Sequence, residues 1–216
     1  MASRLTTATA PSTTAAHRAL ERAIRACDSC DLHAERCNPV TGEGSLDARL
    51  MIVGSKPRQH EDLQGRPFAG GSGNVLDHVL NAAGLSRSDV YLTTVVKCRP
   101  DDDRAPSPDE ILACLPHLAA ERELVAPEVI VTLGAFTTSV LLRRAVPIER
   151  VAGYRLDVDG VTLIPTYHPA DAVRGVPQAA VSLRRDLAMA KAVLDGRLST
   201  GAEAMAELRR RRPESN

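Results

Sequence analysis

The sequence predicts an α/β fold of three layers, in which helices cover both faces of a central, mostly parallel four-stranded sheet. Two observations support this prediction. Short apolar runs typical of buried strands recur along the chain, and segments of helical periodicity lie between them. Strands that alternate with helices favour βαβ units and a parallel sheet. The length of 216 residues suits one domain with a substantial hydrophobic core.

Four short strands are predicted, each apolar or rich in β-branched residues. They are Leu50–Gly54, Val90–Val96, Val129–Leu133 and Thr162–Tyr167. A hairpin over Leu156–Val161, which turns at Asp159-Gly160, is expected to lead into the last strand. Because the carboxyl ends of parallel strands meet at one edge of the sheet, residues that follow these strands are expected to line a common crevice.

Four helices are predicted to connect and follow these strands. They are Gly73–Ala83, Pro108–Leu124, Ala135–Arg143 and Ala179–Leu194. In the first helix, Leu76, Val79 and Leu80 recur at helical spacing. Ser107 stands directly before the second helix, where an N-cap is expected. The last helix is amphipathic and is expected to close the domain.

The predicted domain covers residues 17–196 and lies between two tails. Residues 1–16 are rich in Ala, Ser and Thr without a periodic pattern, so a flexible tail is expected there. Residues 197–216 form a basic tail that contains Arg209–Arg212. This arginine run is either a solvated helix end or an arm that contacts phosphates.

The 27 basic and 27 acidic residues cancel, so any binding of nucleic acid must depend on local patches of charge. No apolar run is long enough to span a membrane, and none resembles a secretory signal. A cytoplasmic monomer without membrane contact is therefore expected. In that reducing compartment, clustered cysteines favour a metal over disulfides.

Four of the five cysteines form the most distinctive pattern of the chain. Cys27 and Cys30 form a C-x-x-C pair, and Cys98 and Cys114 follow much later. Such a set can close a long loop around one metal centre, and its spacing allows a structural zinc ion or an iron–sulfur cluster. The alternative is a set of scattered buried thiols. Cys37 has no evident partner and is not expected to be a ligand.

Polar residues follow three of the predicted strands. The segments are Gly54–Asp62 with its continuation to Gly70, then Thr93–Pro100, and finally Thr166–Ala170 with Arg174 close behind. A single segment of this kind could be a solvated loop without a function. Three that meet at one edge of a sheet indicate a binding site.

These segments, in this order, resemble the iron–sulfur branch of the uracil-DNA glycosylase superfamily, often called family 4. The resemblance extends over residues 22–194 and is carried by the C-x-x-C pair and by EDLQGRPFAGGSG, VYLTTVVKCRP, PDEILACLPHL, PEVIVTLG and PTYHPA. It implies the fold described above and the excision of a base from DNA. It also implies a 4Fe-4S cluster on Cys27, Cys30, Cys98 and Cys114. A structural role is expected for this cluster, and a redox role is the alternative.

The resemblance further implies roles for individual residues. His168 would donate a hydrogen bond to the departing pyrimidine, and Phe68 would stack on a base flipped out of the duplex. Glu61 would position water or stabilise the sugar cation, unless it serves to order its loop. The remaining base-binding candidates are Gly54, Ser55, Lys56 and Thr94, and the candidates for DNA phosphate contacts are Arg58, Lys97, Arg99 and Arg174.

Two departures from the family pattern bear on the identity of the base. The family begins the first loop Gly-Glu-x-Pro-Gly with a small residue at x, whereas Lys56 and Arg58 flank Pro57 here. The family has asparagine at the position of Thr94, and a hydroxyl cannot reproduce the paired hydrogen bonds of an amide. Loss of such a partner weakens discrimination between bases. The substrate could therefore be uracil or another non-standard pyrimidine, including a phage-type modified base.

Three functions are compatible with the sequence. The first is a DNA glycosylase that hydrolyses the N-glycosidic bond and leaves an abasic site. The second is a non-catalytic paralogue that binds DNA in the same cleft, and the third is an iron–sulfur electron carrier. The base-handling residues favour the glycosylase, because electron transfer does not require them.

Overall fold

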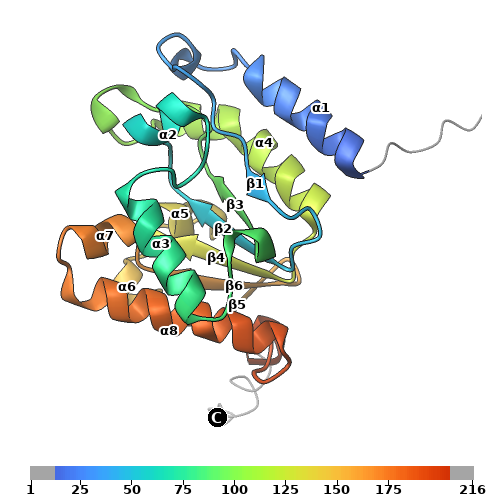
Figure 1. Ribbon diagram of the computed structural model, residues 1–216, viewed down its shortest axis with the longest axis vertical. Coiled ribbons are helices and arrows are strands. Elements are labelled where there is room, and N and C mark those ends of the chain that lie inside the picture. The colour runs from blue at the N-terminus through green and yellow to red at the C-terminus, as the bar shows by residue number, and fades with distance from the viewer. Residues whose placement is uncertain (1–12, 205–216) are drawn as a thin grey trace, which may run out of the picture.

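A mixed sheet of six strands forms the centre of the computed structural model, which describes residues 13–204 (Figure 1). The strand order is β1-β3-β2-β4-β6-β5. The strands are β1 (Glu43–Gly44), β2 (Leu50–Gly54), β3 (Val90–Thr94), β4 (Val129–Leu133), β5 (Leu156–Val158) and β6 (Val161–Thr166). The four central strands run parallel, and the two edge strands are antiparallel to their neighbours.

The four predicted strands are confirmed as the parallel centre of the sheet, but the sheet has six strands rather than four. β1 is only two residues long and contains no apolar run, so no periodic pattern marks it in the sequence. β5 is the first arm of the predicted hairpin. Asp159 and Gly160 have φ angles of 54° and 79°, as a tight type I′ turn requires.

The four predicted helices are confirmed, with bounds that differ by at most two residues. The α-helices are α1 (Thr13–Arg25), α2 (Gln59–Gln64), α3 (Gly71–Ala82), α4 (Pro108–Val125), α5 (Gly134–Leu141), α6 (Ile148–Val151), α7 (Pro169–Val173) and α8 (Pro177–Leu194). Ser107 caps α4 as predicted, because its hydroxyl oxygen accepts the backbone N–H of Glu110 at 3.2 Å. Within residues 13–204, no helix combines the length and the apolar composition needed to cross a membrane.

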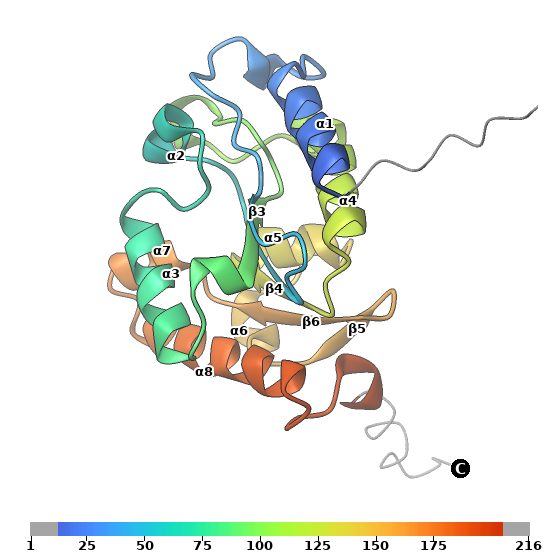
Figure 2. The same ribbon diagram turned by 45° about the vertical axis from the view of Figure 1, so that its right-hand side comes forward.

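The side chains of β2 show how the sheet divides the core into two layers. All five residues of β2 are buried. Leu50 and Ile52 pack in the core beneath α3 and α8, whereas Met51 and Val53 pack in the core beneath α4. Figure 2 shows α3, α7 and α8 on one side of the sheet and α1 with α4 on the other. The predicted three-layer architecture is therefore confirmed.

The predicted tails overlap the ordered structure at both ends. α1 begins at Thr13, inside the expected flexible tail 1–16, and its residue Ile24 is buried. At the other end, Gly201 donates its backbone N–H to the Thr162 hydroxyl at 2.9 Å, so the start of the expected basic tail packs on β6. Residues 1–12 and the arginine run Arg209–Arg212 lie outside the described residues.

Candidate active site

A pocket of about 300 Å³ lies at the carboxyl ends of the parallel strands. β2 is flanked by β3 on one side and by β4 on the other, so the crevice opens where the strand order reverses. Most of the predicted site residues line this pocket: Gly54, Ser55, Lys56, Arg58, Glu61, Phe68, Thr94, His168 and Arg174. Lys97 and Arg99 do not line it.

The ring of Phe68 forms one wall of the pocket. The side chain is 5% exposed, and its ring centroid lies 6.4 Å from that of His168. A Cβ atom at Gly54 would lie 2.7 Å from Phe68 Cζ, so the end of β2 must be glycine for the ring to lie there. The φ angle of Phe68 is +53°, a left-handed conformation that is unfavourable for an aromatic residue.

His168 is held as a neutral hydrogen-bond donor. It is the N-cap of α7, and its Nδ1 accepts the backbone N–H of Ala170 at 3.1 Å, which leaves the proton on Nε2. Burial lowers the pKa of His168 to about 4; nearby Asp171 opposes this shift, and nearby cations reinforce it. No group within residues 13–204 accepts a hydrogen bond from Nε2, so this donor is available to a ligand in the pocket.

The hydroxyl of Thr94 is engaged by the backbone. Its Oγ1 donates to the Val96 carbonyl at 2.8 Å. Its methyl carbon Cγ2 is the Thr94 atom nearest to Gly54, at 3.4 Å from a Cβ built there. Thr94 therefore presents an apolar methyl group beside the Phe68 ring, and its hydroxyl does not replace the amide of an asparagine.

The two cations of the first loop differ in their surroundings. Lys56 Nζ donates to the Asp103 carbonyl at 2.8 Å, and burial lowers the pKa of Lys56. Arg58 lines the pocket without a partner for its guanidinium within the described part of the chain. Arg99 pairs with the Asp103 carboxylate at 2.9 Å. The loop around Asp103 therefore binds Lys56 and Arg99 but leaves Arg58 open to an anion.

Glu61 orders the first loop, and its predicted role in catalysis remains a prediction. Its side chain is buried and lines the pocket. One carboxylate oxygen, Oε2, accepts the backbone N–H of Arg58 at 3.1 Å and thereby caps α2. A single carboxylate thus orders the first loop and faces the site.

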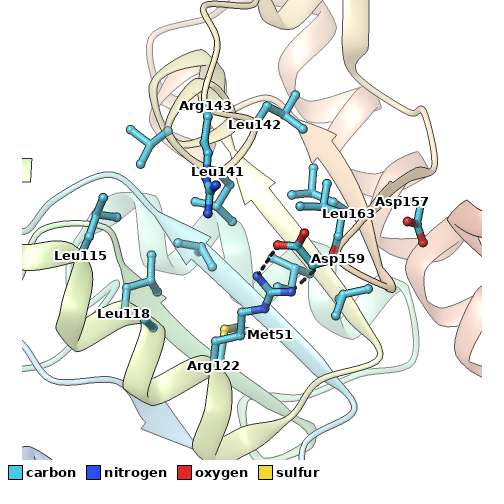
Figure 3. Close-up of a pocket in the computed structure, with 16 residues that line it drawn as sticks. Met51, Leu115, Leu118, Arg122, Leu141, Leu142, Arg143, Asp157, Asp159 and Leu163 are labelled. Atoms are coloured by element: carbon cyan, nitrogen blue, oxygen red, sulfur yellow. Dashed lines mark hydrogen bonds and ion pairs between the residues drawn. The ribbon is translucent and has the colours of Figure 1, made fainter. Parts of the chain in front are cut away.

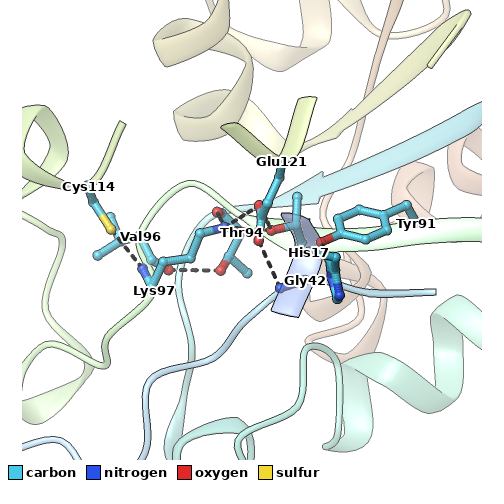
Figure 4. A network of polar contacts seen from close by, with 9 residues as sticks. His17, Gly42, Tyr91, Thr94, Val96, Lys97, Cys114 and Glu121 are labelled. Atoms are coloured by element: carbon cyan, nitrogen blue, oxygen red, sulfur yellow. Dashed lines mark hydrogen bonds and ion pairs between the residues drawn. The ribbon is translucent and has the colours of Figure 1, made fainter. Parts of the chain in front are cut away.

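The burial of Lys97 contradicts its predicted contact with DNA phosphate. The side chain is 1% exposed, and Nζ bonds to Glu121 Oε2 and to Thr93 Oγ1, each at 2.6 Å (Figure 4). Nζ also donates to the Thr94 carbonyl at 2.8 Å. Glu121 Oε1 accepts the backbone N–H of Gly42 at 2.9 Å. Lys97 is therefore part of a buried network between β3 and α4 and cannot reach a phosphate.

The four predicted ligand cysteines line one cavity, remote in sequence but close in space: Cys27, Cys30, Cys98 and Cys114. All four are free thiols. Lys97 donates its backbone N–H to Cys114 Sγ, and Arg36 donates Nη1–H to Cys98 Sγ, each at 3.1 Å. Burial raises the pKa of Cys114 to about 11 in the absence of a bound metal. Donors of this kind stabilise thiolate ligands.

Four thiols on one cavity form a donor set that suits iron or zinc. Within residues 13–204, no three His, Cys, Asp or Glu side chains converge as one bound ion requires. Iron–sulfur clusters are held by cysteine thiolates, the ligand type that lines this cavity. Cys37 does not line this cavity, and its backbone N–H bonds instead to Asp62.

A second cavity of about 520 Å³ lies on the α4 and α5 side of the sheet (Figure 3). Its floor is apolar and includes Met51, Leu118 and Leu163. Arg122 and Asp159 form an ion pair of 3.8 Å across it. None of the predicted site residues lines this cavity, so its larger size does not make it the candidate active site.

Comparison with known proteins identifies the family. The family described as the uracil DNA glycosylase superfamily matches residues 41–188, which extend from before β1 into α8. The chain belongs to this superfamily. Within the uracil DNA glycosylase superfamily, it is 43% identical over 153 residues to a type-4 uracil-DNA glycosylase of Thermotoga maritima, covering 70% of this chain and 80% of that protein.

Two further relatives show how the similarity differs between the types of uracil-DNA glycosylase. The chain is 40% identical over 178 residues to a type-4 uracil-DNA glycosylase of Pyrobaculum aerophilum, covering 79% of this chain and 90% of that protein. It is 36% identical over 156 residues to a type-5 uracil-DNA glycosylase of Mycobacterium tuberculosis, covering 61% of this chain and 58% of that protein. The similarity to the type-4 proteins is therefore both higher and more extensive.

Two residues that hold the predicted site residues His168 and Phe68 in place were not predicted from the sequence. Asp171 Oδ2 accepts the backbone N–H of His168 at 3.1 Å. The spacing His168-x-x-Asp171 is a capping-box pattern, so this contact had a sequence signal. Arg87 binds the backbone carbonyls of Pro67 and Phe68, and no local pattern indicates these contacts.

Proposed function

We propose that this protein removes uracil from DNA by hydrolysing the N-glycosidic bond and leaving an abasic site. The observation that carries the proposal is the neutral His168, whose Nε2–H is available in a pocket that also contains the Phe68 ring. The type-4 uracil-DNA glycosylases to which the chain is similar support the same substrate. A pocket of about 300 Å³ is in the size range of small-ligand sites.

Base binding begins with removal of the nucleotide from the duplex stack, which costs roughly a few kcal/mol. The flipped base would enter the pocket and stack on the Phe68 ring, within reach of His168. Stacking on a buried aromatic ring recovers about 1–3 kcal/mol per base. The Thr94 methyl group adds an apolar contact at the same wall.

Bond cleavage leaves negative charge on the pyrimidine and positive charge on the sugar. His168 Nε2–H would donate to the pyrimidine carbonyl where negative charge accumulates. A neutral donor that is already desolvated needs no reorganisation as the bond breaks. The Glu61 carboxylate would stabilise the sugar cation or orient the attacking water, while its Oε2 remains bonded to Arg58 N–H.

Phosphate contacts would come from the rim of the pocket. Arg58 at the start of α2 and Arg174 at the end of α7 both line it. Arg174 is paired with Asp171, so DNA binding at this residue requires an adjustment of that pair. Arg99, bound to Asp103, would act from outside the pocket.

The four cavity-lining cysteines would hold a 4Fe-4S cluster. Their position around one cavity and the N–H donors to Cys98 and Cys114 support this assignment. The cluster would serve as a cross-link between the segment after α1, the loop after β3, and α4. No step of base excision requires it.

An oligonucleotide that contains one uracil tests the proposal. Single-turnover excision, measured as strand scission after alkali, should be slower by about a hundredfold or more in His168→Ala because one preorganised donor is lost. His78 is exposed on α3 and does not line the pocket, so His78→Ala serves as the matched control.

Two results would contradict the proposal. If His168→Ala excises uracil as fast as the wild type, His168 is not the donor to the base. If the folded wild-type protein excises no uracil from single- or double-stranded DNA, uracil is not its substrate.

A further inference from the structure

Phe68 occupies a strained backbone conformation that its own loop does not explain. Its φ angle of +53° lies in the left-handed region, which is unfavourable for an aromatic residue. The side chain is nevertheless buried and lies beside His168. Contacts from other parts of the chain must therefore hold this conformation.

Arg87 supplies such contacts. It lies in the short 3-10 helix Arg87–Asp89 that precedes β3. Nη2 donates to the Phe68 carbonyl at 2.6 Å, and Nη1 donates to the Pro67 carbonyl at 3.2 Å. Nε pairs with Asp77 Oδ1 on α3 at 2.6 Å, which fixes the orientation of the guanidinium.

The first turn of α3 confines the same carbonyl from another direction. A Cβ atom at Gly73 would lie 1.8 Å from the Phe68 oxygen, so this oxygen reaches the helix only because residue 73 is glycine. The Phe68 carbonyl is thus held between the backbone of α3 and the guanidinium of Arg87. Since φ of Phe68 sets the direction of its side chain, this contact also sets the position of the ring.

We propose that Arg87 is a positioning residue for base excision, which acts by holding the Phe68 carbonyl so that the ring lies over Gly54 beside His168. Arg87 does not line the pocket and touches no reacting atom. The proposal rests on the proposed function for its consequence in catalysis. The position of the ring is a property of the free protein and can be measured without substrate.

The ring can be observed directly because the chain has only two phenylalanines. Protein labelled with 4-fluorophenylalanine should give two fluorine resonances, and Phe136→Leu assigns them. Arg87→Met should shift or broaden the Phe68 resonance and leave the Phe136 resonance in place. Arg87→Lys, which retains a cationic donor, should move the Phe68 resonance less.

Kinetics then tests whether Arg87 affects uracil excision through the position of the Phe68 ring. Arg87→Met should slow single-turnover uracil excision by about ten- to a hundredfold, as expected from a small misplacement at the site. In a Phe68→Ala background the same substitution should cause no further loss. Arg49→Met is the matched control, because Arg49 also pairs with a carboxylate, Glu128, but lies before β2, at the opposite end of the sheet from the pocket.

An unchanged Phe68 resonance in Arg87→Met would overturn the proposal. So would an equal loss of activity with and without the Phe68 ring, since Arg87 would then act by another route. If the wild type excises no uracil, the proposed function fails, and the fluorine resonances still decide whether Arg87 positions the ring.

Discussion

At the scale of single residues, burial and one backbone hydrogen bond fix the chemistry of His168. The Ala170 N–H occupies Nδ1, and burial disfavours the imidazolium form. The result is a donor whose charge does not change between neutral and mildly acidic conditions. At Thr94, by contrast, a backbone hydrogen bond removes a polar group from the site. Its hydroxyl is bonded to the Val96 carbonyl, and only its methyl group faces the ring.

The lowered pKa of His168 predicts a loss of stability in acid. The pKa falls from 6.5 in the unfolded chain to about 4 in the folded protein, so the unfolded state binds more protons between these values. The stability that His168 contributes is complete above the unfolded pKa and decreases as the pH falls toward the folded pKa. Relative to His168→Gln, the wild type should lose roughly 2 kcal/mol of unfolding free energy between about pH 7 and about pH 5.

Urea unfolding of both proteins at the two pH values measures this difference. Any effect of acid on the cysteine site is common to both proteins and cancels. An equal pH dependence in the two proteins would show that His168 titrates normally in the folded state.

At the scale of elements, the buried pair Lys97–Glu121 joins the end of β3 to α4. Both side chains are 1% exposed. Glu121 also binds the backbone of Gly42, so three separate segments share one carboxylate.

The strands and long helices could be predicted because apolar periodicity is local, whereas β1 has no apolar pattern and pairs with β3 through its backbone.

Removal of one partner of this pair should be strongly destabilising. Glu121→Leu leaves the Lys97 ammonium buried without a counter-charge, and the expected loss of unfolding free energy is about 3–5 kcal/mol. The double variant Lys97→Met with Glu121→Leu should recover much of that loss, because no unpaired charge remains.

The exposed pair Arg49–Glu128 provides the control. Glu128→Gln should change the unfolding free energy by less than about 1 kcal/mol, because both side chains are more than half exposed. Chemical denaturation measures all the variants. A double variant as unstable as Glu121→Leu would argue against an effect of unpaired charge.

At the scale of the whole molecule, the four cysteines bring three segments that are distant in sequence to one cavity. The segment after α1 contributes Cys27 and Cys30, the loop after β3 contributes Cys98, and α4 contributes Cys114. Residues 26–42 contain only the short 3-10 helix Asp31–His33. A metal centre that cross-links these segments would therefore account for much of their stability.

Loss of one of the four cysteines should destabilise residues 26–42. Cys114→Ser should lower the iron content and the visible absorbance of the purified protein, together with its melting temperature, because metal binding and folding are coupled. Hydrogen exchange should accelerate in residues 26–42, while the parallel strands remain protected. Cys37→Ser should behave as the wild type, since Cys37 lies outside the cavity. Zinc in place of iron in the wild type would contradict the assignment.

The sequence by itself determined the parallel strands, the main helices, the cap of α4, the family resemblance and the loops that form the pocket. These features depend on local periodicity, turn chemistry and motifs, which are formed by residues close together in the sequence. The tertiary structure decided that Lys97 is buried, that the Thr94 hydroxyl turns to the backbone and that Arg87 holds the Phe68 loop. Those outcomes depend on desolvation and on partners distant in sequence, and the same residue type can be solvated or buried without any change in its local pattern.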